Sequence, residues 1–185
     1  MQSNDKNQRG LRKRRQRGAD LIEFTMVLIP LLAIMFVLID ISWGIFVKAT
    51  LQYAVRAGLR YGITITATQA KAASNSDLTT MVKDYVQANS LGTLTGTANR
   101  AYIQVNFFKL DSSTPPNVVS ANGDGDGNVS PNIMQVSVVN FPLRALAPRI
   151  FSLAIKPDNS ASTINAASAD QVEPSNDVPP MGAVP

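Results

Sequence analysis

The sequence contains no cysteine and no histidine among its 185 residues. The lack of cysteine excludes a disulfide framework, and the lack of both residue types excludes Cys/His zinc sites. Without histidine the commonest general acid–base residue is missing, and no G-x-S-x-G nucleophile motif occurs. These absences argue against a hydrolase, and we expect a protein that is not an enzyme and has no resident cofactor.

Charge is also scarce and unevenly placed. Charged residues make up 16% of the chain, against roughly 25% in a typical soluble domain. The formal net charge is +4, yet seven of the 17 basic residues precede Gly18, namely Lys6, Arg9, Arg12, Lys13, Arg14, Arg15 and Arg17. A short basic block beside an apolar helix typically sets membrane orientation. No aromatic-lined basic surface follows the block, so we expect no nucleic-acid binding.

A long apolar run follows the basic block. Residues 24–39 carry no charge, and after Asp40 the run continues to Val47. As a helix, residues 24–47 would span about 36 Å, more than the roughly 30 Å hydrocarbon core of a bilayer. Pro30 is tolerable there if neighbouring groups satisfy the freed carbonyl, and Trp43 suits the far interface. The pattern predicts a transmembrane segment.

The helical pattern continues beyond the membrane segment to about residue 62. Apolar and small residues at spacings of three and four form one face, and Gln52, Arg56 and Arg60 form the other. The first face comprises Leu51, Ala54, Val55, Gly58 and Leu59. We expect one long helix over 19–62, whose small residues allow close packing.

The rest of the chain predicts a small α+β domain over 77–172 with an antiparallel sheet, after a linker at 63–76. Ser76 or Asp77 can cap a helix with an apolar stripe made by Leu78, Met81, Val82, Tyr85 and Val86. Residues 101–110 and 133–141 alternate as strands do, and we expect them to pair. The basic leader at 1–18 and the tail at 173–185 have no apolar periodicity, so we expect both to be disordered.

Three interpretations compete for the N-terminal region. A secretory signal peptide has an apolar region of about 7–15 residues followed by a small-residue cleavage site. Here the run is longer and no such site follows closely. A plain single-pass anchor explains the hydropathy and the basic block, but it gives no reason for Glu23 at the start of the apolar run.

The stretch RGADLIEF, residues 17–24, resembles the processing motif of prepilins, which a membrane aspartyl peptidase cuts after the glycine. Gly18 has no side chain and can enter a tight protease cleft, and cleavage would leave Ala19 as the new N-terminus. An unpaired carboxylate at Glu23 is costly in a membrane. In an assembly, Glu23 of one subunit can pair with the amine of another, which removes a penalty that both would otherwise carry.

The longer segment GADLIEFTMVLIPLLAIMFVLIDISWGIFVKATLQYAVRAGLRYG, residues 18–62, resembles the TadE-like pseudopilins of tight-adherence pilus systems. The resemblance implies a type IV pilin-like fold and a minor pilin-like subunit of the bacterial inner membrane. It also implies processing by a prepilin peptidase, a periplasmic C-terminal domain, and partners among other pilin and pseudopilin subunits and the inner-membrane assembly platform. The alternative is a single-pass envelope anchor whose outer domain binds a ligand or partner.

One loop has oxygen-bearing side chains at alternate positions, namely Asn122, Asp124, Asp126 and Asn128. This spacing imitates the first four ligand positions of a calcium loop, with Gly127 at position six. The acid required at position twelve is missing, because Ile133 stands there. Asn, Asp and Gly are also turn formers, so a polar turn without Ca²⁺ is the favoured interpretation.

Overall fold

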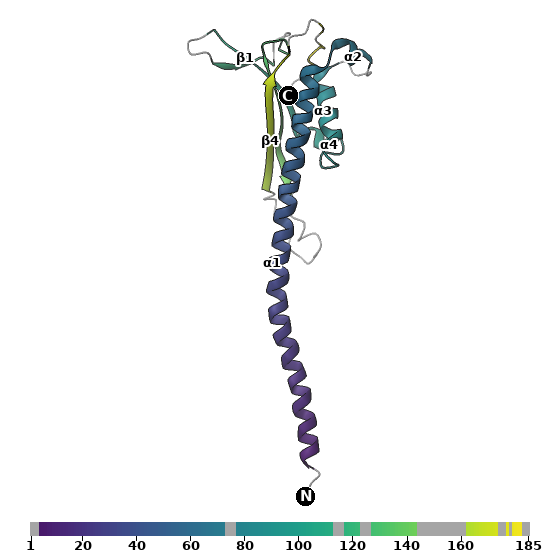
Figure 1. Cartoon of the computed structure of the whole chain (residues 1–185), viewed down its shortest axis with the longest axis vertical. Coiled ribbons are helices and arrows are strands. Elements are labelled where there is room, and N and C mark those ends of the chain that lie inside the picture. Colours follow the sequence, from purple (N-terminus) through teal and green to yellow (C-terminus); the bar gives the residue numbers. More distant parts are fainter. Residues whose placement is uncertain are drawn as a thin grey trace. The chain divides into compact units, whose positions relative to one another are not determined.

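The computed structural model describes residues 4–72, 77–112, 117–122, 127–143, 162–173, 177 and 179–182. Side chains are described from Asp20 onward, apart from residues 71 and 72. The chain divides into two compact units, of which the first has residues 4–43 as its described part. The second unit begins at Gly44 and contains the remaining described residues. The architecture is α+β, as predicted (Figure 1).

Helix α1 spans Asn4–Thr64 and includes Pro30. It therefore starts well inside the basic leader, where we predicted disorder, and that prediction is wrong for residues 4–18. The reason is local, since Lys, Arg, Gln and Leu all favour helix and no proline interrupts this stretch. At its other end the helix stops two residues beyond the expected residue 62.

Three short helices follow: α2 at Ala67–Ala72, α3 at Leu78–Ala88 and α4 at Thr97–Arg100. Helix α2 lies within the stretch that we expected to be a linker. Asp77 is the N-cap of α3, where its side chain accepts a hydrogen bond from the backbone N–H of Thr80. Such a bond satisfies one of the amide groups that every helix start leaves without an internal partner.

The sheet has four antiparallel strands in the order β2-β1-β3-β4. Their bounds are Ile103–Leu110 for β1, Val118–Ser120 for β2, Ile133–Leu143 for β3 and Ser162–Gln171 for β4. The expected pairing of the strands near 101–110 and 133–141 is confirmed. The register places Ile103 opposite Val138, Val105 opposite Val136 and Phe107 opposite Met134, and all six residues belong to the buried core.

One core joins the second half of α1, helix α3 and the sheet. The predicted inner face of α1 is confirmed, because Leu51, Ala54, Val55 and Leu59 are each at most 3% exposed. Their partners in the same buried cluster include Val82 and Val86 of α3 and the inner residues of β1 and β3. Burial of so many apolar side chains is the main force that holds the unit together.

Two glycines allow the elements to approach α1 closely. A Cβ built on Gly58 would lie 2.3 Å from Cγ2 of Val86, and one built on Gly62 would lie 2.8 Å from Cγ2 of Val82. Ala54, Gly58 and Gly62 form a row of small residues, one at every fourth position along α1. Helix α3 can therefore pack almost against the backbone of α1, in agreement with the predicted role of Ala54 and Gly58.

The C-terminal residues supply hydrogen bonds to two helix starts. The carbonyls of Pro180 and Met181 accept from the amides of Leu78 and Thr79, the first two residues of α3. The carboxylate of Asp177 accepts from the backbone N–H of Thr68, at 3.1 Å, and from its hydroxyl, at 2.9 Å. The sequence led us to expect a disordered tail, but these residues lie against the domain because the helix starts need acceptors.

Candidate functional site

The first feature of functional interest is the exposed apolar half of α1. Its large hydrophobic residues from Leu21 to Phe46 are 36–75% exposed, apart from the half-buried Leu28 and Phe36. Among the described residues, none of the most apolar stretch is buried. A helix that is apolar on all sides requires an apolar environment, either lipid or other helices. By length and composition this segment is a candidate membrane span, which suggests a membrane anchor.

The neutral polar side chains in this segment hydrogen-bond to the helix itself. The Thr25 hydroxyl donates to the carbonyl of Leu21, at 2.6 Å, and the Ser42 hydroxyl donates to the carbonyl of Leu38, at 2.8 Å. Such bonds to the preceding turn let hydroxyl groups enter an apolar environment at little cost. Asp40 also has an interaction partner.

Glu23 lies five residues after Gly18 on the same helix, and its side chain is exposed. An exposed carboxylate at the start of an apolar helix is accessible to a group on another molecule. The backbone of Gly18 and Ala19 is helical, so a peptidase that binds an extended substrate would have to unwind this turn first. The predicted roles of Gly18, Ala19 and Glu23 stay predictions.

The two described ends of the candidate calcium loop belong to the hydrogen-bond network of the domain. The side-chain oxygen of Asn122 accepts from the backbone N–H of Phe107, at 2.6 Å, and its amide donates to Oδ1 of Asn106, at 3.0 Å. Asn128 is 3% exposed and donates to the carbonyl of Pro179. Asp124 and Asp126 lie outside the described residues. No group of three or more acidic residues suited to a metal ion occurs among the residues that are described.

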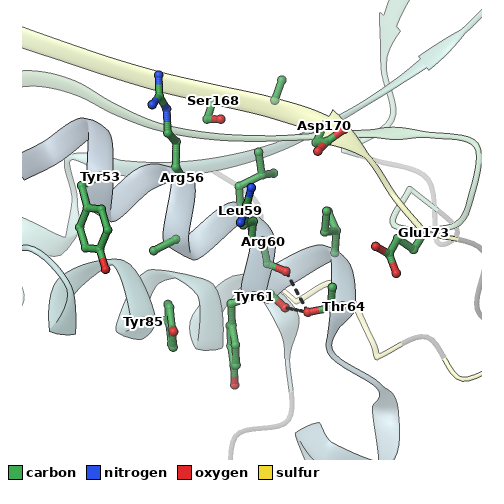
Figure 2. Close-up of a pocket in the computed structure, with 13 residues that line it drawn as sticks. Tyr53, Arg56, Leu59, Arg60, Tyr61, Thr64, Tyr85, Ser168, Asp170 and Glu173 are labelled. Atoms are coloured by element: carbon green, nitrogen blue, oxygen red, sulfur yellow. Dashed lines mark hydrogen bonds between the residues drawn. The ribbon is translucent and has the colours of Figure 1, made fainter. Parts of the chain in front are cut away.

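A groove of about 1020 Å³ lies beside the second half of α1 (Figure 2). Tyr53, Arg56 and Arg60 of α1 line it together with Asp170 of β4 and Glu173. Arg56 and Arg60 are one helical turn apart, so they lie on the same face of α1. Figure 2 shows Asp170 and Glu173 on one side of α1 and Tyr85 of α3 on the other.

Two stacked tyrosines form the α3 side of the groove. The rings of Tyr61 and Tyr85 are parallel within 2°, with centroids 4.4 Å apart. Burial raises the pKa of Tyr61, and the neighbouring Tyr85 adds to the effect. The sequence placed Tyr85 on the inner stripe of its helix, but its side chain is 38% exposed and covers Tyr61 instead.

A second polar cluster lies at α3 and has a structural explanation. Arg100 forms an ion pair with Asp84 and also donates to the carbonyl of Thr80, at 3.2 Å. Partial burial acts to raise the pKa of Asp77, but hydrogen bonds from Thr80 and Thr79 and the nearby Arg100 charge outweigh it and lower that pKa. The cluster attaches α4 to α3 and holds the start of α3 in place.

The sequence predicted part of the groove and missed the rest. The exposed positions of Arg56 and Arg60 follow from helical periodicity, and both are exposed in the structure. Asp170 and Glu173 line the same groove as these arginines only because of the fold. The sequence signal of β4 is too weak to predict where this strand lies.

Comparison with known proteins bears on the N-terminal third of the chain. Residues 18–60 match the family model described as TadE-like protein. The matched range begins at the glycine of the candidate cleavage site and includes the exposed apolar half of α1 and most of its buried continuation. No curated protein and no solved structure matches the chain.

Proposed function

We propose, from the TadE-like family that residues 18–60 match, that this protein is a minor pilin or pseudopilin that helps to build a Tad-type adhesive pilus. The match itself supports a Tad pilus-associated protein. Beyond this, we infer that a prepilin peptidase cuts after Gly18. Other pilin and pseudopilin subunits and the inner-membrane assembly platform would then be the partners of the mature chain.

The observation that carries the proposal is Glu23 on an exposed apolar helix. Among the described residues, none of its most apolar stretch is buried, so this part of the helix would require lipid before assembly and other helices afterwards. A carboxylate in that environment is costly unless a positive group meets it. After cleavage, the new amine of Ala19 in a neighbouring subunit is such a group, and the pairing would favour one axial register.

The basic leader supports an orientation for the membrane-bound chain. The block of Arg and Lys before Gly18 would stay in the cytoplasm, where such residues concentrate beside membrane helices. The second unit, from Gly44 onward, would then lie in the periplasm. A reporter enzyme that is active only in the periplasm, fused after Pro185, is expected to be active. Activity of a second reporter enzyme, one that is active only in the cytoplasm and is fused at the same position, would contradict this orientation.

Processing is tested by expressing the full chain with and without a prepilin peptidase. N-terminal sequencing and intact mass should show a chain that begins at Ala19 only when the peptidase is present. Gly18→Ala is expected to be processed poorly, because its methyl group enters the cleft at the scissile bond. Gly10→Ala makes the same change within the leader and should be processed normally. A chain that keeps residues 1–18 with an active peptidase present would favour the envelope-anchor alternative.

The assembly role of Glu23 needs a variant that is still processed. We expect Glu23→Gln to be cut normally but to co-purify poorly with other pilus subunits, because the amide has no charge to pair with an amine. Asp20→Asn removes a carboxylate one turn earlier on the same helix and serves as the matched control. Equal assembly of the Glu23→Gln variant and the unaltered chain would show that Glu23 sets no register.

A further inference from the structure

The groove beside the second half of α1 carries both signs of charge, the basic groups on α1 and the acidic groups at the end of β4 and just after it. Arg56 and Arg60 are exposed on α1, and Asp170 and Glu173 are exposed at the end of β4 and just after it. Within the described part of the chain, no ion pair joins these basic and acidic residues to one another. Asp170 accepts a hydrogen bond from the backbone N–H of Gln171, at 2.8 Å, and all four charged side chains are exposed, so they can reach groups on another molecule.

The groove also has space for side chains of a second molecule. Ala57 lies between the two arginines in sequence and lines the groove with only a methyl group. The stacked rings of Tyr61 and Tyr85 form one aromatic side of the groove. Tyr53, which also lines the groove, is 61% exposed. Tyrosine and arginine are among the residue types enriched at protein interfaces.

We propose that this groove is a homotypic interface, in which the same groove of a second copy of this chain lies against it. An interface related by a two-fold axis uses one patch on both partners, so the patch must complement itself. Here the arginines of one copy would meet Asp170 and Glu173 of the other, and the same contacts would occur a second time by symmetry.

The mixed charge is what favours a second copy over another partner. A partner with a uniformly acidic helix would meet the arginines but would be repelled by Asp170 and Glu173. A uniformly basic partner would meet the opposite problem. Electrostatic complementarity of this kind mainly selects the partner and its orientation. The proposal does not depend on cleavage after Gly18 or on entry into a pilus.

The test uses two charge-reversed forms of the full chain in native membranes. One form carries Arg56→Glu with Arg60→Glu, so its groove is wholly acidic. The other carries Asp170→Lys with Glu173→Lys, so its groove is wholly basic. All four positions are exposed, so the substitutions leave the core intact. Each form is made with two different epitope tags, which allows any pair to be mixed.

Crosslinking reports contact between copies. The natural chain has no cysteine, so Thr64→Cys at the groove gives one attachment point for a bismaleimide. Leu91→Cys, at an exposed position that does not line the groove, is the matched control. The unaltered groove should give crosslinked dimers from position 64 and few from position 91.

Self-pairing predicts a specific pattern. Each charge-reversed form alone should lose most of its dimers, because like charges then face each other. The mixture of the two forms should recover dimers that contain both tags, because opposite charges meet again, and this recovery also shows that both forms fold. Dimers that persist in either form alone, or that fail to return in the mixture, would overturn the proposal. Loss of dimers in the acidic form only would therefore also overturn it, because Asp170 and Glu173 would then make no contact across the interface.

Discussion

Substitution of Gly58 by alanine tests whether close approach of α3 to α1 is required by the core. The added methyl would lie 2.3 Å from Cγ2 of Val86 and 3.7 Å from Cγ1 of Val82. Carbon atoms in contact are usually about 3.5–4.0 Å apart, so the first distance is a clash of more than 1 Å. Val86 is fully buried and β-branched, which leaves it little rotameric freedom to move aside. Helix α3 must therefore shift.

The magnitude follows from two opposing terms. Overpacking a tight core typically costs about 1–3 kcal/mol, while replacing glycine by alanine inside a helix gains about 1 kcal/mol. Gly44→Ala on the same helix has the same propensity gain, but its methyl meets only the tip of the Leu143 side chain, at 3.2 Å. The difference in unfolding free energy between the two variants should therefore be about 1–3 kcal/mol, with Gly58→Ala the less stable.

The assay is native-state hydrogen exchange of the β3 amides in the full chain in detergent, since exchange of core strands reports global stability. A double-mutant cycle with Val86→Ala isolates the contact, because the smaller residue leaves room for the new methyl. The two substitutions should be coupled by about 1 kcal/mol in the favourable direction. Equal stability of the Gly58→Ala and Gly44→Ala variants, or additivity in the cycle, would refute the close-packing argument.

Three further predictions concern helix starts and one turn. Asp77→Ala should lower stability by about 1 kcal/mol near neutral pH, whereas Asp77→Asn keeps a capping acceptor and should cost less; thermal unfolding measures both. The lowered pKa of Asp77 means that its carboxylate stabilises the fold above about pH 4, and that this stability is lost as the pH falls through the folded-state pKa. Asp177→Ala should cost about 0.5–2 kcal/mol, because Thr68 loses its capping acceptor; faster amide exchange confined to α2 would be the first sign. Leu91 is exposed with φ 48°, so Leu91→Asn should raise the unfolding free energy by up to about 1 kcal/mol, and no gain in urea unfolding would contradict this.

Sequence patterns predicted the elements that have strong periodicity. The buried face of α1 from Leu51 to Leu59 and the pairing of β1 with β3 are confirmed, and of the two predicted caps, Ser76 or Asp77, the structure uses Asp77. Each depends on local signals, namely apolar spacing, a capping side chain and alternation. The predicted membrane segment likewise corresponds to the exposed apolar half of α1.

The elements that sequence reasoning missed have weak local signals. Strand β4 reads STINAASADQ, in which small and polar residues dominate, and Ala166 is its one residue in the buried core. Its position is fixed by pairing with β3, including an irregularity between Val138 and Phe141 where Asn140 bonds to Asn165. The bonds from Asp177 to α2 join residues 109 apart in sequence, and no local pattern can reveal such a contact. For the same reason, the acidic side of the groove was not predictable.

The shared use of α1 limits how the protein can be divided. Val47, Leu51, Val55 and Leu59 belong to the core of the second unit, yet they directly follow the apolar half of the same helix. Deleting the whole helix to obtain a water-soluble fragment would remove one wall of that core along with the anchor. A soluble fragment that retains its fold must therefore begin near Gly44, so that it loses the exposed apolar turns and keeps those that the sheet and α3 cover.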